Sequence, residues 1–173
     1  LYHPCQILAD LFTIVEKKGT MEGRKIAFIG DGNNVANSWI ESAILLGLDF
    51  SIATPEGYEP PEELMERARR QAGRFRHTND PLEAARGADV INTDVWVSMG
   101  MEEEKEDRRR IFSRYAIDEG LMAVAAPDAI VMHCLPAHRS EEITESVFER
   151  FQDVIFTQAE NRLHAQKALL GIF

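Results

Sequence analysis

The segment His133-Cys134-Leu135-Pro136 places an imidazole and a thiol directly after a short apolar run. That run, residues 129–132, is partly β-branched, which is typical of a strand that is buried on both faces. Ligands of open parallel sheets bind at the carboxyl ends of the strands, so His133 and Cys134 form a candidate reactive pair. The alternative is a cysteine that ends a core strand and is simply packed in the interior.

Two other predicted strands also run into polar residues. Residues 25–29 are followed by Gly30-Asp31-Gly32-Asn33-Asn34, and residues 88–93 are followed by Asp94-Val95-Trp96-Val97-Ser98-Met99-Gly100. The first turn does not complete the dinucleotide fingerprint G-x-G-x-x-G, because Val35 stands where a small residue is required. The amides of Asn33 and Asn34 can donate and accept hydrogen bonds, which favours a ligand that carries both a carboxylate and an ammonium group.

The elements that must position these residues alternate between strands and helices. Further strands are predicted at residues 49–54, 74–78 and 153–157, and helices at residues 35–46, 61–72 and 81–86, each closed by a glycine. This alternation predicts βαβ units, and therefore an α/β doubly wound (Rossmann-like) parallel sheet of about five strands with helices on both faces. The charge-rich run at residues 102–110 predicts a solvated helix.

The first residues of the chain combine a helix start with chemical groups. His3-Pro4-Cys5-Gln6 precedes an apolar pattern with helical spacing, formed by Ile7, Leu8, Leu11, Phe12 and Val15. Pro4 suits a first helical turn, whose unpaired N–H groups attract an anion. The alternative is a capped surface helix that has a histidine at its start by chance. Because the chain begins at Leu1, we expect that a preceding segment has been removed.

Composition limits the class of protein. A chain of 173 residues that is 45% hydrophobic can bury one core, so residues 1–173 are expected to form one domain. Two cysteines are too few for a disulfide framework, which favours a reducing, cytoplasmic location. The net charge of −10 argues against a nucleic-acid partner. We expect no membrane span, because no apolar stretch approaches the roughly 18 residues required.

Five motifs occur in one order along the chain: His3-Pro4-x-Gln6, Gly30-Asp31-Gly32-Asn33-Asn34, Asp94-x-x-x-Ser98-Met99-Gly100, His133-Cys134-Leu135-Pro136 and Glu160-Asn161-Arg162. Together they resemble the C-terminal, ornithine-binding half of the ornithine carbamoyltransferases, over essentially the whole chain. Aspartate carbamoyltransferases share the first motif but lack the Ser-Met-Gly loop. The Ser-x-Arg-Thr-Arg phosphate-binding motif of the family's other half does not occur here. We therefore expect that the N-terminal carbamoyl phosphate-binding domain is absent from this chain and that the chain alone is inactive.

The resemblance implies a reaction and a set of site residues. The carbamoyl group of carbamoyl phosphate is transferred to the δ-amine of L-ornithine, giving L-citrulline and phosphate, without a cofactor or a metal. The implied ornithine-binding residues are Asn34, Asp94, Ser98 and Met99. The implied carbamoyl phosphate-binding residues are His3, Gln6, Cys134, Leu135 and Arg162, of which Cys134, His3 and Arg162 are catalytic. In these roles His3 stabilises charge on the carbamoyl oxygen, Arg162 faces the phosphate, and Cys134 positions the substrate and can accept a proton.

Two alternatives remain open beside this interpretation. The first is a carbamoyltransferase for a diamine or an acylated ornithine, and the second is a non-catalytic amino-acid-binding module. The resemblance also implies a homotrimer or a multiple of trimers. Finally, the first helix and the helix at residues 160–172 are expected to keep an exposed apolar stripe that includes Leu163, Leu169, Leu170, Ile172 and Phe173.

Overall fold

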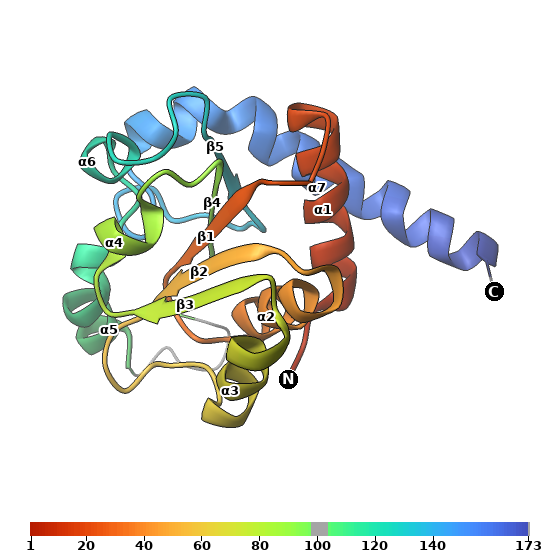
Figure 1. Cartoon of the computed structure of the whole chain (residues 1–173). Helices are drawn as coiled ribbons and strands as arrows, with labels where there is room; N and C mark the ends of the chain where they lie inside the picture. The colour runs from red at the N-terminus through yellow and green to blue at the C-terminus, as the bar shows by residue number, and fades with distance from the viewer. Residues whose placement is uncertain (98–103, 173) are drawn as a thin grey trace.

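The computed structural model describes residues 1–97 and 104–172 (Figure 1). At its centre is a five-stranded sheet in which every neighbouring pair is parallel. Its strands are β1 (Lys25–Ile29), β2 (Asp49–Ala53), β3 (Arg74–Thr78), β4 (Val90–Thr93) and β5 (Ile130–His133). The spatial order is β3-β2-β1-β4-β5, so the chain runs outward from β1 to one edge and returns to the other side. The predicted doubly wound α/β fold is confirmed, with its switch point between β1 and β4.

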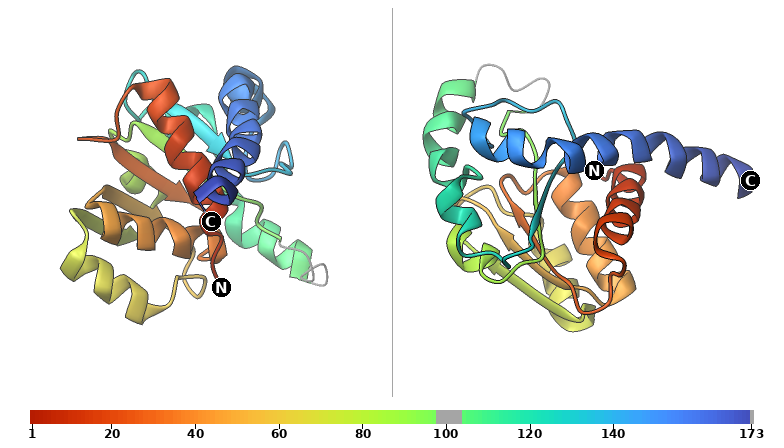
Figure 2. Two further views of the ribbon diagram at one scale, coloured as in Figure 1. Left: turned by 90° about the vertical axis from the view of Figure 1, so that its right-hand side faces the viewer. Right: turned by 90° about the horizontal axis from the view of Figure 1, so that it is seen from above.

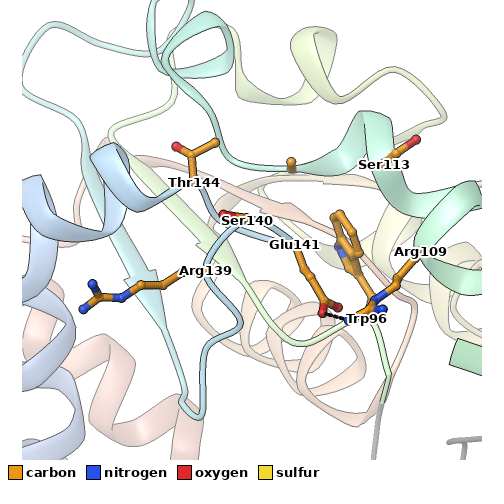
Figure 3. Close-up of a pocket in the computed structure, with 8 residues that line it drawn as sticks. Trp96, Arg109, Ser113, Arg139, Ser140, Glu141 and Thr144 are labelled. Carbon is orange, nitrogen blue, oxygen red and sulfur yellow. Dashed lines mark hydrogen bonds and ion pairs between the residues drawn. The ribbon is translucent and has the colours of Figure 1, made fainter. Parts of the chain in front are cut away.

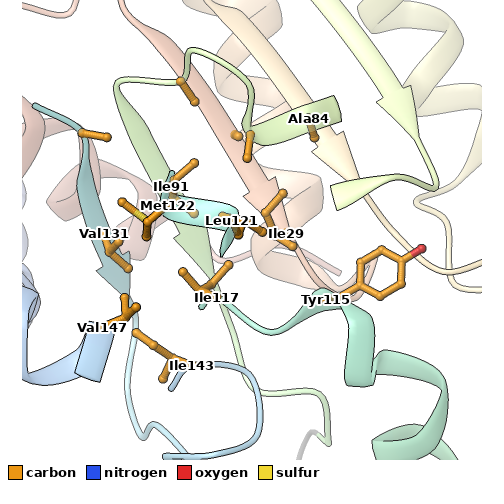
Figure 4. Close-up of a cluster of buried hydrophobic side chains, with 14 of the residues drawn as sticks. Ile29, Ala84, Ile91, Tyr115, Ile117, Leu121, Met122, Val131, Ile143 and Val147 are labelled. Atoms are coloured by element: carbon orange, nitrogen blue, oxygen red, sulfur yellow. The ribbon is translucent and has the colours of Figure 1, made fainter. Parts of the chain in front are cut away.

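Helices cover both faces of the sheet (Figures 1 and 2). They are α1 (Pro4–Lys18), α2 (Asn34–Leu46), α3 (Glu62–Gln71), α4 (Pro81–Ala85), α5 (Lys105–Phe112), α6 (Glu119–Met122) and α7 (Glu145–Ile172). Alternate residues of each strand point to opposite faces, and this separates the core into two clusters. One cluster packs α1, α2 and α3 against the sheet, with Trp39 stacked on Phe50 at 5.9 Å between ring centroids. The other packs α4, α6 and the first turns of α7 against Ile29, Ile91 and Val131 (Figure 4).

The strand predicted at residues 153–157 is wrong. These residues belong to α7, which runs without a break from Glu145 to Ile172. The buried residues of this helix recur every three or four positions: Val147, Phe148, Phe151, Val154, Ile155, Gln158 and Asn161. That spacing buries one face of a helix. Phe156, within the proposed strand, is about half exposed. The three consecutive apolar residues 154–156 resemble a strand in isolation, but the spacing of the apolar residues on either side of them is helical.

Two other expectations require adjustment. The charge-rich helix exists as α5, but Arg108 is buried rather than solvated, with Asp31 as its ion-pair partner. In α1 the buried face carries Ile7 and Ile14 together with polar side chains, whereas Leu8 and Phe12 are more than two-fifths exposed. The expected exposed apolar stripe is therefore present on α1, and it continues on α7 at Leu163, Leu170 and Ile172. Leu169 is only partly exposed, and Phe173 lies outside the described residues.

No helix within the described residues is long and apolar enough to cross a membrane.

Candidate active site at the carboxyl edge of the sheet

A cavity of about 610 Å³ opens where β1, β4 and β5 end, beside the first turn of α1 and the middle of α7. It brings together the predicted site residues that the structure describes: His3, Gln6, Asn34, Asp94, Cys134, Leu135 and Arg162. Ser98 and Met99 lie outside the described residues. The site therefore draws on five separate segments of the chain, which the switch point of the sheet gathers at one edge.

Asp94 is the most firmly held polar group of the cavity. Its Oδ1 accepts a hydrogen bond from the Val95 N–H at 2.8 Å and from the Cys134 thiol at 3.0 Å. Its Oδ2 accepts from Asn33 Nδ2 at 2.7 Å. A carboxylate offers about four acceptor positions, so one position on Oδ2 is left for a ligand. The carboxylate is thus fixed in place with room for one further donor.

The two asparagines of the glycine-rich turn have different roles. Asn33 is the N-cap of α2, because its Oδ1 accepts from the N–H groups of Val35 and Ala36 at 2.9 and 3.1 Å. The prediction that both amides serve a ligand is therefore adjusted: Asn33 supports α2 and Asp94, while Asn34 is exposed and lines the cavity.

Cys134 is a protonated thiol in this site. Burial raises its pKa well above the ordinary range, and the negative charge of Asp94 raises it further. The thiol donates to Asp94, which requires the proton to be present. The suggestion that Cys134 accepts a proton from the substrate amine is therefore not supported by its surroundings. A positioning role remains.

His133 does not share the cavity with Cys134. Its side chain is completely buried, and its Nδ1 accepts from the Leu135 N–H at 2.9 Å. The ring proton is consequently on Nε2, which donates to Glu142 at 3.1 Å. The prediction of a reactive pair is therefore wrong for His133, which fixes the turn that follows β5. Only Cys134 of the two lines the cavity.

His3 and Arg162 lie on the side of the cavity formed by α1 and α7. The backbone N–H of His3 donates to Ser38 Oγ at 2.7 Å, which anchors the start of α1 to α2. Partial burial and the positive charge of Arg162 lower the pKa of His3, while Asp94 opposes this effect. The lowered pKa favours the neutral imidazole of His3 in a cavity that Arg162 also lines. Arg162 forms no ion pair with any residue in the described part of the chain, so its charge is available to an anion.

Several polar residues around the site were missed by sequence reasoning. They are Asp10, Asn92, Gln158 and Glu142, all buried, together with Arg108. Arg108 donates to the backbone oxygen of Trp96 and pairs with Asp31, and its guanidinium lies 4.9 Å from the ring centre of Tyr58. Such pairings join residues far apart in sequence. A signal was nevertheless present, because Asp10 interrupts the face of α1 that also carries Ile7 and Ile14.

The only group of described residues whose donor atoms could surround a metal ion is His138, Glu141 and Glu142. Glu141 pairs with Arg109, and Oε1 of Glu142 accepts from His133 and from the backbone N–H of His138, whereas Oε2 of Glu142 has no hydrogen-bond partner among the described residues. These contacts indicate that the three residues stabilise the turn after β5.

A second cavity, of about 440 Å³, lies between α5 and the segment that leads to α7 (Figure 3). Its arginines are already neutralised: Arg109 by Glu141, as Figure 3 shows, and Arg139 by Glu145 and Glu149. With its charges paired internally, this cavity offers little to a charged ligand. The cavity at the carboxyl edge remains the candidate site.

The fold and this site define a doubly wound α/β domain with a polar cavity at its switch point. A model of the aspartate/ornithine carbamoyltransferase Asp/Orn binding domain matches residues 22–173. The chain belongs to this family.

Relatives of known name agree with this assignment. The ornithine carbamoyltransferase of Geobacter metallireducens is 54% identical over 172 residues, which are 99% of this chain and 57% of that protein. The solved anabolic ornithine carbamoyltransferase of Campylobacter jejuni is 47% identical with a TM-score of 0.93, over 99% of this chain and 58% of its own. The enzyme of Pyrococcus furiosus is 51% identical with a TM-score of 0.91, over 98% and 56%. The chain thus spans a little over half the length of these relatives.

Proposed function

We propose that this chain is the ornithine-binding part of an enzyme that transfers the carbamoyl group of carbamoyl phosphate to the δ-amine of L-ornithine. The products are L-citrulline and phosphate. The observation that carries the proposal is the fixed carboxylate of Asp94 at the edge of a cavity that also contains Asn34 and Arg162. This arrangement suits an amino acid at one end and an anion at the other.

The cavity supports a role for each residue. The open position on Asp94 pairs with the α-ammonium of ornithine, and the Asn34 amide meets its carboxylate, with Ser98 and Met99 completing this end by resemblance. Arg162 attracts the phosphate, and neutral His3 can donate to the carbamoyl oxygen as negative charge develops there. Gln6 and the main chain at Cys134 and Leu135 orient the carbamoyl NH2 group. No step requires a metal or a cofactor.

The substrate amine must lose its proton before it can attack. A lysine-like amine with a pKa of ~10.4 is neutral in only about one molecule in 2,500 at pH 7, a cost of roughly 4.6 kcal/mol. Removal from water lowers the pKa of such an amine. A Cys134 thiolate would oppose this effect by holding the ammonium form. Because the thiol stays protonated, Cys134 does not oppose the loss of the amine's proton.

We further propose that turnover requires a second domain that supplies most of the phosphate contacts and the trimer interface, and that the enzyme is cytoplasmic. The chain covers only 57% of the Geobacter relative, which leaves room for such a domain. An apolar groove between α1 and α7, formed by Leu8, Phe12, Ala165, Ala168, Leu169 and Ile172 with His164 at its edge, supports a covering partner.

Calorimetric titration of the full-length protein distinguishes this function from its alternatives. L-Ornithine should bind in the presence of carbamoyl phosphate, whereas 1,4-diaminobutane and N-acetyl-L-ornithine should bind at least tenfold more weakly, because each lacks a group that Asp94 or Asn34 holds. Preference for either analogue would favour a carbamoyltransferase that acts on a diamine or an acylated ornithine. Ornithine binding without citrulline formation would favour the non-catalytic module.

A further inference from the structure

Asp10 is a completely buried carboxyl group on α1, one turn after Gln6. It forms no ion pair with another described residue. A buried carboxyl group without a cation is costly unless hydrogen bonds satisfy it. Asp10 Oδ1 accepts from Gln6 Nε2 at 2.8 Å and from Gln158 Nε2 at 2.6 Å, and Oδ2 lies 3.4 Å from Asn92 Nδ2. Its strong hydrogen bonds therefore all involve side-chain amides.

These hydrogen bonds decide which way the Gln6 amide faces. An amide carries a donor nitrogen on one side and an acceptor oxygen on the other. Asp10 Oδ1 accepts, so Nε2 of Gln6 must turn toward it and Oε1 must turn away. Gln6 lines the cavity beside His3, Cys134 and Arg162, and its Oε1 has no hydrogen-bond partner within residues 1–97 and 104–172. A buried acceptor without a partner is rare in native structures and indicates a missing donor.

Asp10 fixes a second amide in the same manner. Gln158 donates to Asp10 through Nε2 and accepts from the backbone N–H of His133 through Oε1 at 2.8 Å. His133 is the last residue of β5 and directly precedes Cys134. One carboxyl group thus sets the orientation of Gln6 on α1 and ties α7 to the end of β5.

We propose that Asp10 is a positioning residue for the transferred group: it holds the Gln6 amide so that Oε1 accepts an N–H from the ligand. The inference rests on the proposed function, in which that N–H belongs to the NH2 group of carbamoyl phosphate. Without Asp10 the amide can rotate by half a turn and present its own NH2 group, which repels the ligand donor.

The role of Asp10 requires an acceptor on Oδ1 and not a negative charge. Both short hydrogen bonds fall on Oδ1, whereas Oδ2 faces only Asn92, whose Oδ1 also has no partner among the described residues. An asparagine can therefore keep its oxygen toward the two glutamines and its NH2 toward Asn92 after rotation of the Asn92 amide. Leucine has a similar shape but offers no acceptor. Asp10→Asn and Asp10→Leu form a matched pair.

Acetyl phosphate is the decisive probe, because a methyl group replaces the NH2 of carbamoyl phosphate. We measure the dissociation constants of both compounds by calorimetry in the full-length protein and its variants. The unaltered protein should prefer carbamoyl phosphate. Asp10→Leu should reduce this preference roughly 10- to 100-fold, whereas Asp10→Asn should largely retain it. Thr13→Val serves as control. Thr13 lies on α1 like Asp10, and its buried hydroxyl accepts a hydrogen bond from Asn161 on α7, not from Gln6.

The outcomes separate the inference from the function on which it rests. If Asp10→Leu weakens both phosphates equally, Asp10 only supports the fold and the inference is wrong. The same holds if Asp10→Asn behaves like Asp10→Leu, or if Thr13→Val changes the preference as much. If the unaltered protein binds neither compound, the proposed function is wrong and the inference fails with it.

Discussion

At the scale of single residues, Asp94 has the most specific expected effect on substrate binding. Asp94→Asn removes the charge that pairs with an α-ammonium group, and it sets an amide NH2 against that of Asn33 or the Val95 N–H. A hydrogen bond to a charged group contributes roughly 1.5–3 kcal/mol, so ornithine affinity should fall about 10- to 150-fold. Carbamoyl phosphate affinity should change little. Calorimetry with both substrates on the full-length variant provides the check; equal losses would identify Asp94 as structural.

The reactivity of Cys134 gives a second prediction. Its raised pKa means that less thiolate is present at pH 7 than for an ordinary cysteine. Because the thiolate is the nucleophile, alkylation of Cys134 by iodoacetamide should be much slower than that of free cysteine between pH 7 and 9. Mass spectrometry of peptides containing Cys134 measures the rate. Rapid alkylation at pH 7 would contradict the thiol assignment, and unfolding the chain in urea should restore the ordinary rate.

Asp10 should make stability depend on pH. Burial raises its pKa from 3.8 to about 7, against the opposing effect of the hydrogen bonds from Gln6, Gln158 and Asn92. Between these values the folded state binds a proton that the unfolded state does not, so the stability from this group is complete below pH 4 and is lost as pH rises toward 7 and above. The full change is at most about 4 kcal/mol.

Urea denaturation of the unaltered chain and of Asp10→Asn at pH 5.5 and pH 8 tests this sign. The difference isolates Asp10 from the other titrating groups, including His3. The variant should gain stability relative to the unaltered chain at pH 8 compared with pH 5.5. The same difference between the variant and the unaltered chain at both pH values would show that Asp10 is ionised in the fold throughout this range.

At the scale of elements, the turn after β1 depends on Gly32. A Cβ at this position would lie 2.4 Å from the backbone N of Pro60 and 2.5 Å from the backbone oxygen of Tyr58. Backbone atoms cannot move aside cheaply, so Gly32→Ala should destabilise the chain by about 1–3 kcal/mol and disturb Asn34. Gly171→Ala in α7 is the control, because nothing lies within 4 Å of its Cβ. Chemical denaturation of both variants measures the difference, and equal stabilities would contradict the close approach.

Local sequence was sufficient for the strands and turns but not for the pairings between them. Four of the five strands are marked by their own apolar residues, whereas β3 has Phe75 alone. The cavity follows from where the parallel strands end. The strand expected at residues 153–157 failed because three apolar residues outweighed the longer helical spacing from Val147 to Asn161. The contacts of Asp10 with Gln158 and of Arg108 with Asp31 join residues 148 and 77 positions apart. No local pattern indicates which partner a buried polar side chain will meet.

At the scale of the whole molecule, the groove between α1 and α7 should make the isolated chain associate. Phe12 is 44% exposed in this groove, and contiguous apolar surface promotes association. Phe12→Glu should therefore lower the average mass measured by light scattering at high concentration. Leu45→Glu is the matched control, since Leu45 is 79% exposed on α2 and does not line the groove. A strictly monomeric chain, or an equal effect of both substitutions, would contradict this use of the surface.

Because α7 is continuous, it fixes the position of Arg162 relative to the core. Its first turns are set in the core by Val147 and Phe148, and Arg162 lies farther along the same uninterrupted rod, which projects beyond the sheet (Figure 2). Each helical residue advances the chain by about 1.5 Å and turns it by about 100°. One residue added between Val154 and Arg162 would therefore swing the guanidinium away from the cavity. A loop can rearrange so that the residues after an insertion keep their positions, but a continuous helix rotates and shifts every residue beyond it. The number of residues between Phe148 and Arg162 therefore determines whether Arg162 faces the cavity.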